Sequence, residues 1–313
     1  MRTRVLLLAA AVALATGSLL SAQFAQQTVS GLASGGIYAS LALAIVLIYR
    51  ATQVINFAQG AMAMFTTYIA WELMQHGYGR WAAYALAVVV AFGGGVLLER
   101  TVIRPVESAP PVTTVILTVG LLVTFNGLAA WLWTGEIRAF RGPFPTRPVH
   151  VGGVAFSLQD LGTIAAALVA VALLSALFRF TDLGLAMRAA ASRPAAARLV
   201  GIRVGWMLAL GWGLAAALGA VSGILVAPVV FLQPNMMDAV LIYALAAAVL
   251  GGIESLAGAV VGGLALGVVL NLVGTYVHVA TSELRLPIAL ALLLVVLLVK
   301  PNGLFGRVAV RRV

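Results

Sequence analysis

The sequence predicts an all-α fold, a polytopic membrane helical bundle of nine or ten transmembrane helices. Hydrophobic residues make up 63% of the 313 residues and charged residues only 9%, whereas a soluble domain carries about a quarter charged residues. Apolar runs recur along the chain at roughly 20 residues, the length that crosses a hydrocarbon core about 30 Å thick. Composition and run length together exclude a soluble globular protein.

The apolar runs divide the chain into ten expected spans, with only short segments between them. We therefore expect one structural unit without a soluble domain. The expected spans are 5–22, 29–49, 56–75, 81–99, 112–134, 160–178, 206–227, 238–252, 257–279 and 286–300.

The basic residues give this bundle an orientation. If all ten spans cross, 14 of the 19 Lys and Arg residues lie on one side and 5 on the other. The richer side is the cytoplasmic one by the positive-inside rule. It holds Arg2, Arg4, Arg50, Arg100, Arg104, Arg179, Arg188, Arg193, Arg198, Arg203, Lys300, Arg307, Arg311 and Arg312. The outer side holds Arg80, Arg138, Arg141, Arg147 and Arg285. Because the net charge of +10 sits at helix ends, it does not indicate nucleic-acid binding.

The first 28 residues allow two interpretations. Arg2 and Arg4 precede an apolar run from Val5 to Leu20, and small residues follow it. This pattern fits a first transmembrane span, and it also fits a cleaved secretory signal. The orientation of the remaining spans is the same in both cases.

The segment 238–252 is short for a span and ends in Gly251-Gly252, with Glu254 just beyond. Glycine-rich interruptions at membrane depth are tolerated where the backbone is buried in protein or lines a wet cavity. We expect either a broken or re-entrant element here or an ordinary cytoplasmic turn.

Pairs of glycines four residues apart recur in the spans. Small residues at this spacing allow two helices to approach closely, which drives much of helix association in lipid. We interpret them as internal packing sites, with a dimer interface as the alternative. The pairs are Gly31 with Gly35, Gly219 with Gly223, Gly258 with Gly262, and Gly263 with Gly267.

The sequence lacks the motifs of common enzymes and ATPases. There is no cysteine, and the single lysine, Lys300, follows Val299, so no P-loop is present. Neither HExxH nor GxSxG occurs. The few intramembrane acids, Glu72, Glu99, Asp238 and Glu254, fall near span ends, unlike the buried carboxylate chain of a proton-driven carrier. We therefore expect a non-catalytic chain that binds neither a metal nor a cofactor.

One cationic, Ala-rich segment, about residues 179–205, lies between two apolar stretches on the expected cytoplasmic face. Such a segment is suited to contact a soluble partner. Ser192 before Arg193-Pro194 predicts a helix start. Pro194 to Leu199 is helix-forming, and Gly201 is a plausible stop.

Five blocks of residues, in order along the chain, resemble those of one family. The blocks are Gly31–Leu43 with Ile55–Gly60, Glu99–Val106, Gly184–Ala191 with Ala196–Ile202, Leu250–Ser255 with Gly258–Gly263, and Lys300–Gly306. They are similar to the high-affinity branched-chain amino acid permeases of ATP-binding-cassette (ABC) importers, of the shorter, LivH type.

This resemblance implies the ABC importer permease fold over residues 29–306, followed by a basic cytoplasmic tail, 307–313, in the bacterial plasma membrane. It implies assembly with a second permease subunit of the same family, two cytoplasmic ATP-binding subunits and an extracytoplasmic substrate-binding protein. ATP and Mg would be bound by the partner ATPase subunits. The family's inner loop docks a short coupling helix on the ATPase. Here that role falls on Gly184, Met187, Arg188, Ala189, Ala190, Arg193, Ala196, Ala197, Arg198 and Gly201.

Polar residues within the spans are candidates for the translocation pathway. Gln53, Asn56 and Gln59 are three residues apart, and on one helix they would share a face. Interhelical hydrogen bonding without substrate contact is the alternative. Gln59 and Ala61 also depart from the family pattern, where His and Glu are common. The further candidates are Thr118 and Asn126 in the fifth span and Asn271 in the ninth.

The resemblance favours translocation of amino acids, branched-chain ones first, by an ATP-driven importer. The alternatives are a stand-alone ion-coupled secondary transporter, an ABC permease for urea or another small amide, and a membrane enzyme or scaffold.

Overall fold

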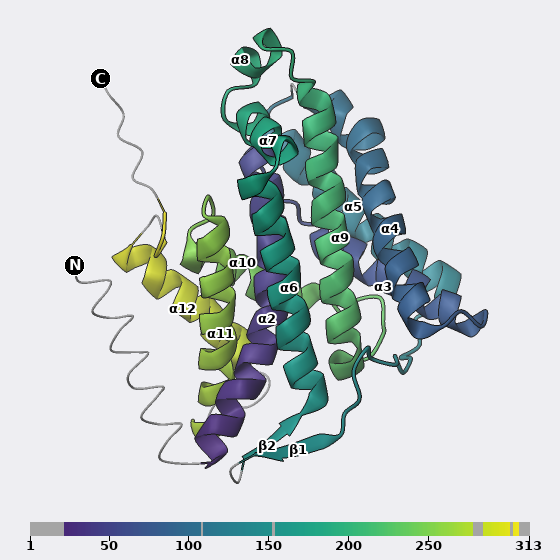
Figure 1. Ribbon diagram of the computed structural model, residues 1–313, viewed down its shortest axis with the longest axis vertical. Coiled ribbons are helices and arrows are strands. Elements are labelled where there is room, and N and C mark those ends of the chain that lie inside the picture. The colour runs from purple at the N-terminus through teal and green to yellow at the C-terminus, as the bar shows by residue number, and fades with distance from the viewer. Residues whose placement is uncertain (1–21, 108, 152–153, 278–283, 301–302, 307–313) are drawn as a thin grey trace.

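The computed structural model describes residues 22–107, 109–151, 154–277, 284–300 and 303–306 (Figure 1). Nearly all of the first expected span, with the question of its cleavage, and the tail 307–313 lie outside the described residues. In the described part, each of the other nine expected spans coincides with a helix.

The helices are α2 (Ala22–Thr52), α3 (Gln59–Gln75), α4 (Arg80–Leu98), α5 (Pro111–Trp133), α6 (Leu158–Phe180), α7 (Asp182–Ser192), α8 (Pro194–Leu199), α9 (Val204–Val230), α10 (Asp238–Gly251), α11 (Leu256–Tyr276) and α12 (Arg285–Val299). A π-helical turn (Glu99–Ile103) and a 3-10 turn (Arg104–Val106) extend α4. Within the described residues, six helices are long and apolar enough to cross a membrane, namely α2, extended α4, α5, α6, α9 and α11. Two shorter apolar helices, α10 and α12, accompany them.

A small antiparallel hairpin at the outer end of the bundle was not predicted from the sequence. Strands β1 (Pro148–Val151) and β2 (Val154–Ser157) pair with Pro148 opposite Ser157 and lead directly into α6. This ribbon lies at the opposite end of the bundle from α7 and α8 (Figure 1).

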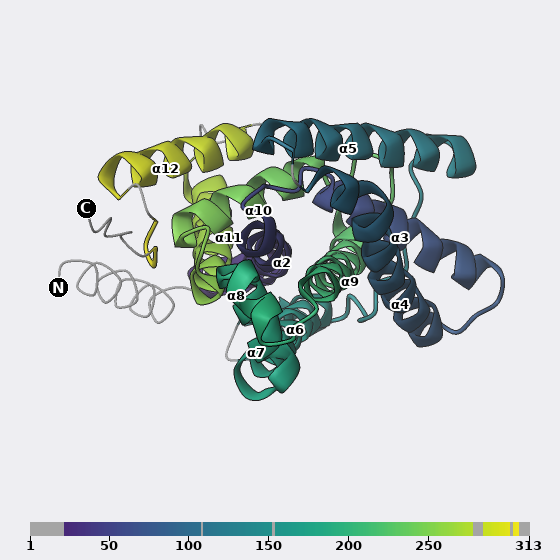
Figure 2. The ribbon, with the colours of Figure 1, turned by 90° about the horizontal axis from the view of Figure 1, so that it is seen from above.

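Helix α2 forms the centre of the bundle. Viewed along the long axis, it is surrounded by α6, α9, α10 and α11, while α5 and α12 lie at the edge (Figure 2). In the most apolar 18-residue stretch of α2, 83% of the residues are buried, whereas in the corresponding stretch of α5 only 11% are buried. Because lipid solvates apolar side chains, the exposed apolar faces of α4 and α5 are suited to face the bilayer.

Helices α2 and α11 touch backbone to backbone. A Cβ atom built on Gly267 would lie 2.3 Å from the amide nitrogen of Gly35, and one built on Gly31 would lie 2.7 Å from the Cα of Val268. One on Gly263 would lie 2.5 Å from the Cα of Ala39. No side chain fits at these positions. The interpretation of these glycine pairs as internal packing sites is confirmed.

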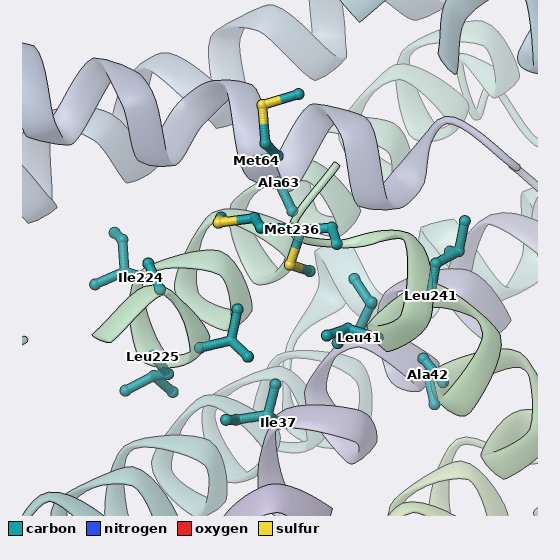
Figure 3. Close-up of a cluster of buried hydrophobic side chains, with 14 of the residues drawn as sticks. Ile37, Leu41, Ala42, Ala63, Met64, Ile224, Leu225, Met236 and Leu241 are labelled. Atoms are coloured by element: carbon teal, nitrogen blue, oxygen red, sulfur yellow. The ribbon is translucent and has the colours of Figure 1, made fainter. Parts of the chain in front are cut away.

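The other predicted glycine pairs also meet neighbouring helices. Gly219 and Gly223 of α9 face Gln59, Ala63 and Thr67 of α3. Gly258 and Gly262 of α11 face the α10 backbone at Gly251 and Ala247. Apolar side chains fill a continuous core between α2, α3, α9 and α10 (Figure 3). Its buried members include Ile37, Leu41, Met64, Ile224, Leu225 and Leu241.

The irregular backbone near α10 lies at the start of this helix, whereas the sequence suggested its end. Phe231 ends α9 with a φ of 63°, and Leu232 exchanges two backbone hydrogen bonds of 2.9 Å with Arg138. Leu232 is fully buried. After α10, Gly252 (φ 106°) begins a tight turn in which the Ser255 hydroxyl accepts from the Gly258 amide at 3.0 Å. The chain therefore passes from α10 to α11 through a tight turn.

We expect Gly267→Ala to destabilise the bundle by about 1–3 kcal/mol, because the added methyl group meets backbone that cannot rotate away. Thermal unfolding of the purified protein in detergent measures this. Gly93→Ala is the matched control, since Gly93 is a helical glycine of α4 with open space at its Cβ position. Equal unfolding temperatures for the two variants would contradict the close contact.

Candidate functional site

The basic segment on the inner face folds as two short helices. Helix α7 begins where the Thr181 hydroxyl accepts a hydrogen bond from the Gly184 amide at 3.0 Å, and Asp182 lies in its first turn. This side-chain cap and the acidic residue both stabilise a helix N-terminus. A Cβ on Gly184 would lie 2.2 Å from the Leu177 carbonyl oxygen, so α7 packs tightly on the end of α6.

Helix α8 has the bounds predicted from the sequence, although its start is different. Pro194 occupies the first turn, and Gly201 (φ 81°) follows the end, where its amide donates to the Arg198 carbonyl at 3.1 Å. Ser192 does not cap it, contrary to expectation. Ser192 is the last residue of α7, and Arg193 precedes α8 without a side-chain cap. The reason is that α7 continues to within two residues of α8.

The predicted coupling residues separate into a buried set and an exposed set. Buried against the bundle are Gly184, Met187, Ala190 and Ala197, and Ala189 is half-buried. Open to the surroundings are Arg188, Arg193, Ala196, Arg198 and Gly201. The buried residues pack the segment onto α2, α6 and α9. Only the exposed set is available to a soluble protein.

Two exposed apolar residues at the tip of α8 are missing from the predicted set. Leu199 is 89% exposed and Val200 is 76% exposed. The arginines of this segment could be predicted as exposed from their charge. The exposure of two apolar residues at a helix end depends on the fold and could not be predicted from the sequence. An exposed apolar tip on a rigid helix is typical of an interaction surface.

An ion pair between the partly exposed Arg104 and the buried Glu99 ties the end of α4 to the start of α9, just after the basic segment. Arg104 Nη2 donates to Glu99 Oε2 at 3.0 Å and to the Gly205 carbonyl at 2.6 Å. Glu99 is 2% exposed, and its second oxygen also accepts from Arg104. The Arg100 guanidinium lies 3.5 Å from the centroid of the Trp206 ring. These contacts fix where the segment rejoins the bundle.

An inner pocket of about 480 Å³ lies beneath the segment. It is lined by residues of α2, α7 and the α10–α11 turn, among them Gln53, Arg188 and Glu254. Movement of α7 would therefore change the shape of a cavity that reaches the end of the central helix.

The first group of pathway candidates does not share a helical face, so that prediction is wrong. Helix α2 ends at Thr52, Gln53 has a φ of 58°, and α3 begins only at Gln59. The chain breaks there because Asn56 caps the next turn, its Oδ1 accepting from the Ala58 amide at 3.0 Å. Gln53 is exposed at the inner pocket, away from the other two.

Asn56 and Gln59 are buried and bonded within the protein. Asn56 Nδ2 donates to Gln59 Oε1 at 3.2 Å, and Gln59 Nε2 donates to the Ala215 carbonyl of α9 at 2.8 Å. These bonds favour the interhelical alternative for both side chains. Their part in the pathway stays a prediction.

The remaining candidates lie in different parts of the bundle. Thr118 is buried on α5 and donates to the Val115 carbonyl at 2.9 Å, and Asn126 lies further along α5. Asn271 of α11 donates to the Gln27 carbonyl at 2.6 Å and to Gln27 Oε1 at 2.8 Å. Asn271 also lines a cavity at the outer end of the bundle.

Comparison with known proteins places this architecture in a class. Residues 27–298 match the family described as branched-chain amino acid transport system / permease component. The chain belongs to this family of ABC transporter permeases, and it is a multi-pass protein of the bacterial inner membrane.

The chain is similar over its length to curated members. It is 30% identical to the high-affinity branched-chain amino acid transport system permease protein LivH of Escherichia coli K12, over 93% of this chain and 98% of that protein. It is 29% identical, with the same coverage, to the corresponding protein BraD of Pseudomonas aeruginosa. Among solved structures, PsaBC from Streptococcus pneumoniae in complex with Fab aligns with a TM-score of 0.48 at 11% identity, over 93% of this chain and 96% of that one.

We expect Arg104→Ala to lower the stability of the purified protein by at least about 1–3 kcal/mol, because Glu99 loses its partner while it stays buried. A thermal unfolding curve measures the loss. The double variant Glu99→Gln with Arg104→Ala should recover part of it, since no unpaired charge remains. Arg203→Ala, at an exposed arginine nearby, is the control. A single variant as stable as this control would show that the pair contributes nothing.

Proposed function

We propose that this chain is a transmembrane subunit of an ATP-driven importer that carries branched-chain amino acids inward. The observation that carries the proposal is the α7–α8 segment, with one side buried on the bundle and an exposed apolar tip at Leu199 and Val200. This is the shape expected of an element that receives motion from a soluble subunit.

The proposed motor is a pair of cytoplasmic ATP-binding subunits that hold ATP and Mg. Their closure would push on α8, and tight packing at Gly184 would pass the displacement to α6 and α9 rather than absorb it. The chain itself would perform no bond chemistry. A second permease subunit of the same family would complete the transmembrane part, and an extracytoplasmic binding protein would deliver the substrate.

The substrate class rests on the relatives. The E. coli and P. aeruginosa proteins are named as permeases of high-affinity branched-chain amino acid systems, and this chain matches them almost end to end. Leucine, isoleucine and valine are therefore the proposed cargo, with urea or another small amide as the alternative.

Uptake by proteoliposomes tests the proposal. The complete complex should accumulate labelled leucine only with the ATPase subunits, the binding protein and ATP, and labelled urea should stay outside. Accumulation of leucine by this chain alone, driven by a proton or sodium gradient, would favour a secondary transporter and overturn the proposal.

We expect Leu199→Asp to reduce co-purification of the ATPase subunits at least about tenfold, because a charge replaces an apolar contact in a desolvated groove. Ile137→Asp is the matched control, since Ile137 is also exposed, at 67%, but belongs to the outer side. Pull-down from membranes followed by quantitative immunoblotting measures the association. Ala197 is unsuitable for this test because it is buried. Equal recovery with both variants would exclude the α8 tip as the docking site.

A further inference from the structure

A cavity of about 450 Å³ lies at the outer end of the bundle, opposite to the coupling segment. Helices α2, α6, α9, α10, α11 and α12 all contribute to its lining. The volume falls within the range of small-molecule sites. One part of the wall is apolar and consists of Ile37, Val226, Val230, Met236, Val240 and Leu270.

Gln159 supplies an unpartnered polar group in this cavity. The side chain is 5% exposed, and within the described residues neither its Oε1 nor its Nε2 has a hydrogen-bond partner. Burying an amide without partners is costly, and nearly all such groups in folded proteins are satisfied. Helix α6 fixes Gln159 in its first turn, where the Ser157 hydroxyl accepts a hydrogen bond from the backbone N–H of Gln159 at 3.1 Å. The side-chain amide is therefore held in place with its bonding capacity unused.

Two opposite charges line the same cavity from different helices. Asp160 follows Gln159 on α6, and Arg285 begins α12. Neither belongs to an ion pair in the part of the chain that the structure describes. One oxygen of Asp160 accepts from the Ser30 hydroxyl at 3.3 Å, and the Ser157 backbone also bonds to this carboxylate, which leaves part of its acceptor capacity free. The Arg285 guanidinium rests against α11, where Gly274 leaves room for it.

The geometry points to a binding site in this chain for a zwitterionic amino acid with a branched aliphatic side chain. Asp160 takes the α-ammonium group, Arg285 takes the α-carboxylate, and the Gln159 amide bonds to the main-chain atoms of the ligand. The side chain of the ligand packs against the apolar wall. This assignment rests on the proposed function and adds the residues that hold the cargo after the binding protein releases it.

The combination of groups favours this ligand over a lipid headgroup or a free anion. An anion would be attracted by Arg285 but repelled by Asp160 in the same cavity. A cation would be attracted by Asp160 but repelled by Arg285. A zwitterion satisfies both charges at once, and a guanidinium is well shaped for a carboxylate. The apolar wall then selects a hydrocarbon side chain over a polar one.

Equilibrium binding of labelled leucine to the complete detergent-purified complex, without binding protein, tests the site. Asp160→Asn, Arg285→Gln and Gln159→Ala should each weaken binding at least about tenfold, since each removes a charged or buried hydrogen bond. Glu136→Gln and Arg147→Gln are matched controls at exposed outer-side residues that do not line the cavity. They should bind leucine like the wild type.

Competition by half-ligands assigns the two ends. Isoamylamine carries only the amine, so its competition should be lost in Asp160→Asn and retained in Arg285→Gln. 4-Methylpentanoate carries only the carboxylate and should show the opposite pattern. Arg285→Lys, which keeps the charge, should restore part of the affinity. Arg285 is exposed at a helix start, so its variants keep the test valid if Asp160→Asn fails to assemble.

The outcomes separate the site from the function. If the wild-type complex takes up leucine but Asp160→Asn and Arg285→Gln bind it as tightly as the two controls, this cavity is not the site. Absence of saturable leucine binding by a wild-type complex that transports leucine also overturns it. A wild-type complex that takes up no leucine overturns the proposed function instead.

Discussion

The backbone contact between α2 and α11 is the constraint on which the rest of the structure depends. Gly35 and Gly267 approach so closely that neither can carry a side chain. In lipid, where apolar burial gives helices little reason to associate, such contact replaces the hydrophobic effect as the source of packing energy. It holds α2 in the centre of the bundle, where its outer half lines one cavity and its inner end lines the other. Both candidate sites are thus built on one fixed helix.

A second close-packed unit faces this one. Helix α9 meets α3 at Gly223, where a Cβ would lie 2.7 Å from the Ala63 carbonyl oxygen. It meets α4 at Gly95, where a Cβ would lie 2.6 Å from the Trp212 carbonyl oxygen. Between the two units the connection is partly polar, since the Ser40 and Ser222 hydroxyls lie 2.7 Å apart in a fully buried position. This hydrogen bond fixes the position of α2 along α9, although no close glycine contact joins the two helices at this point.

Polar side chains whose hydrogen bonds are made within the protein have a structural role, whereas those left without partners are available to a ligand. Asn56 and Gln59 attracted attention in the sequence as amides inside a span, yet both are bonded within the protein. Gln159 lies at the edge of a predicted span, where amides are common, and both polar atoms of its side chain are left unsatisfied, as is Oδ1 of Asn126 on α5. Sequence alone could not separate these cases, because satisfaction depends on which carbonyl a neighbouring helix presents. Only the assembled bundle places the Ala215 carbonyl beside Gln59 and leaves none beside Gln159.

The features that were predictable are those that follow from local chemistry. Hydropathy located nine helices, and glycine spacing located the close contacts, because lipid imposes both requirements on each segment separately. Pro194 and Gly201 bounded α8 through their backbone preferences. The hairpin and the break at Gln53 were not predicted, although both arise from residues close together in the chain, Pro148 to Ser157 and Asn56 with Ala58. The exposures of Leu199 and Val200 were not predictable, since they depend on how α8 packs against the bundle. The outer cavity belongs with these, as six helices must assemble before Asp160 and Arg285 share a wall.

The presence of the opposite charges of Asp160 and Arg285 in one cavity also has an energetic reason in a membrane protein. A charge at the bilayer centre costs roughly 2.5–3.5 kcal/mol on insertion scales, and the cost is smaller at the outer end of the bundle, where Asp160 is half-buried and Arg285 is exposed. Asp160 and Arg285 together bring no net charge, so the cavity is tolerated when empty and neutral when a zwitterion occupies it. Each charge of the ligand gains a partner as it loses water, which keeps the exchange from binding protein to cavity nearly balanced. A balanced exchange suits a transport site, because a cargo held too tightly in the cavity would not leave it when the coupling segment moves.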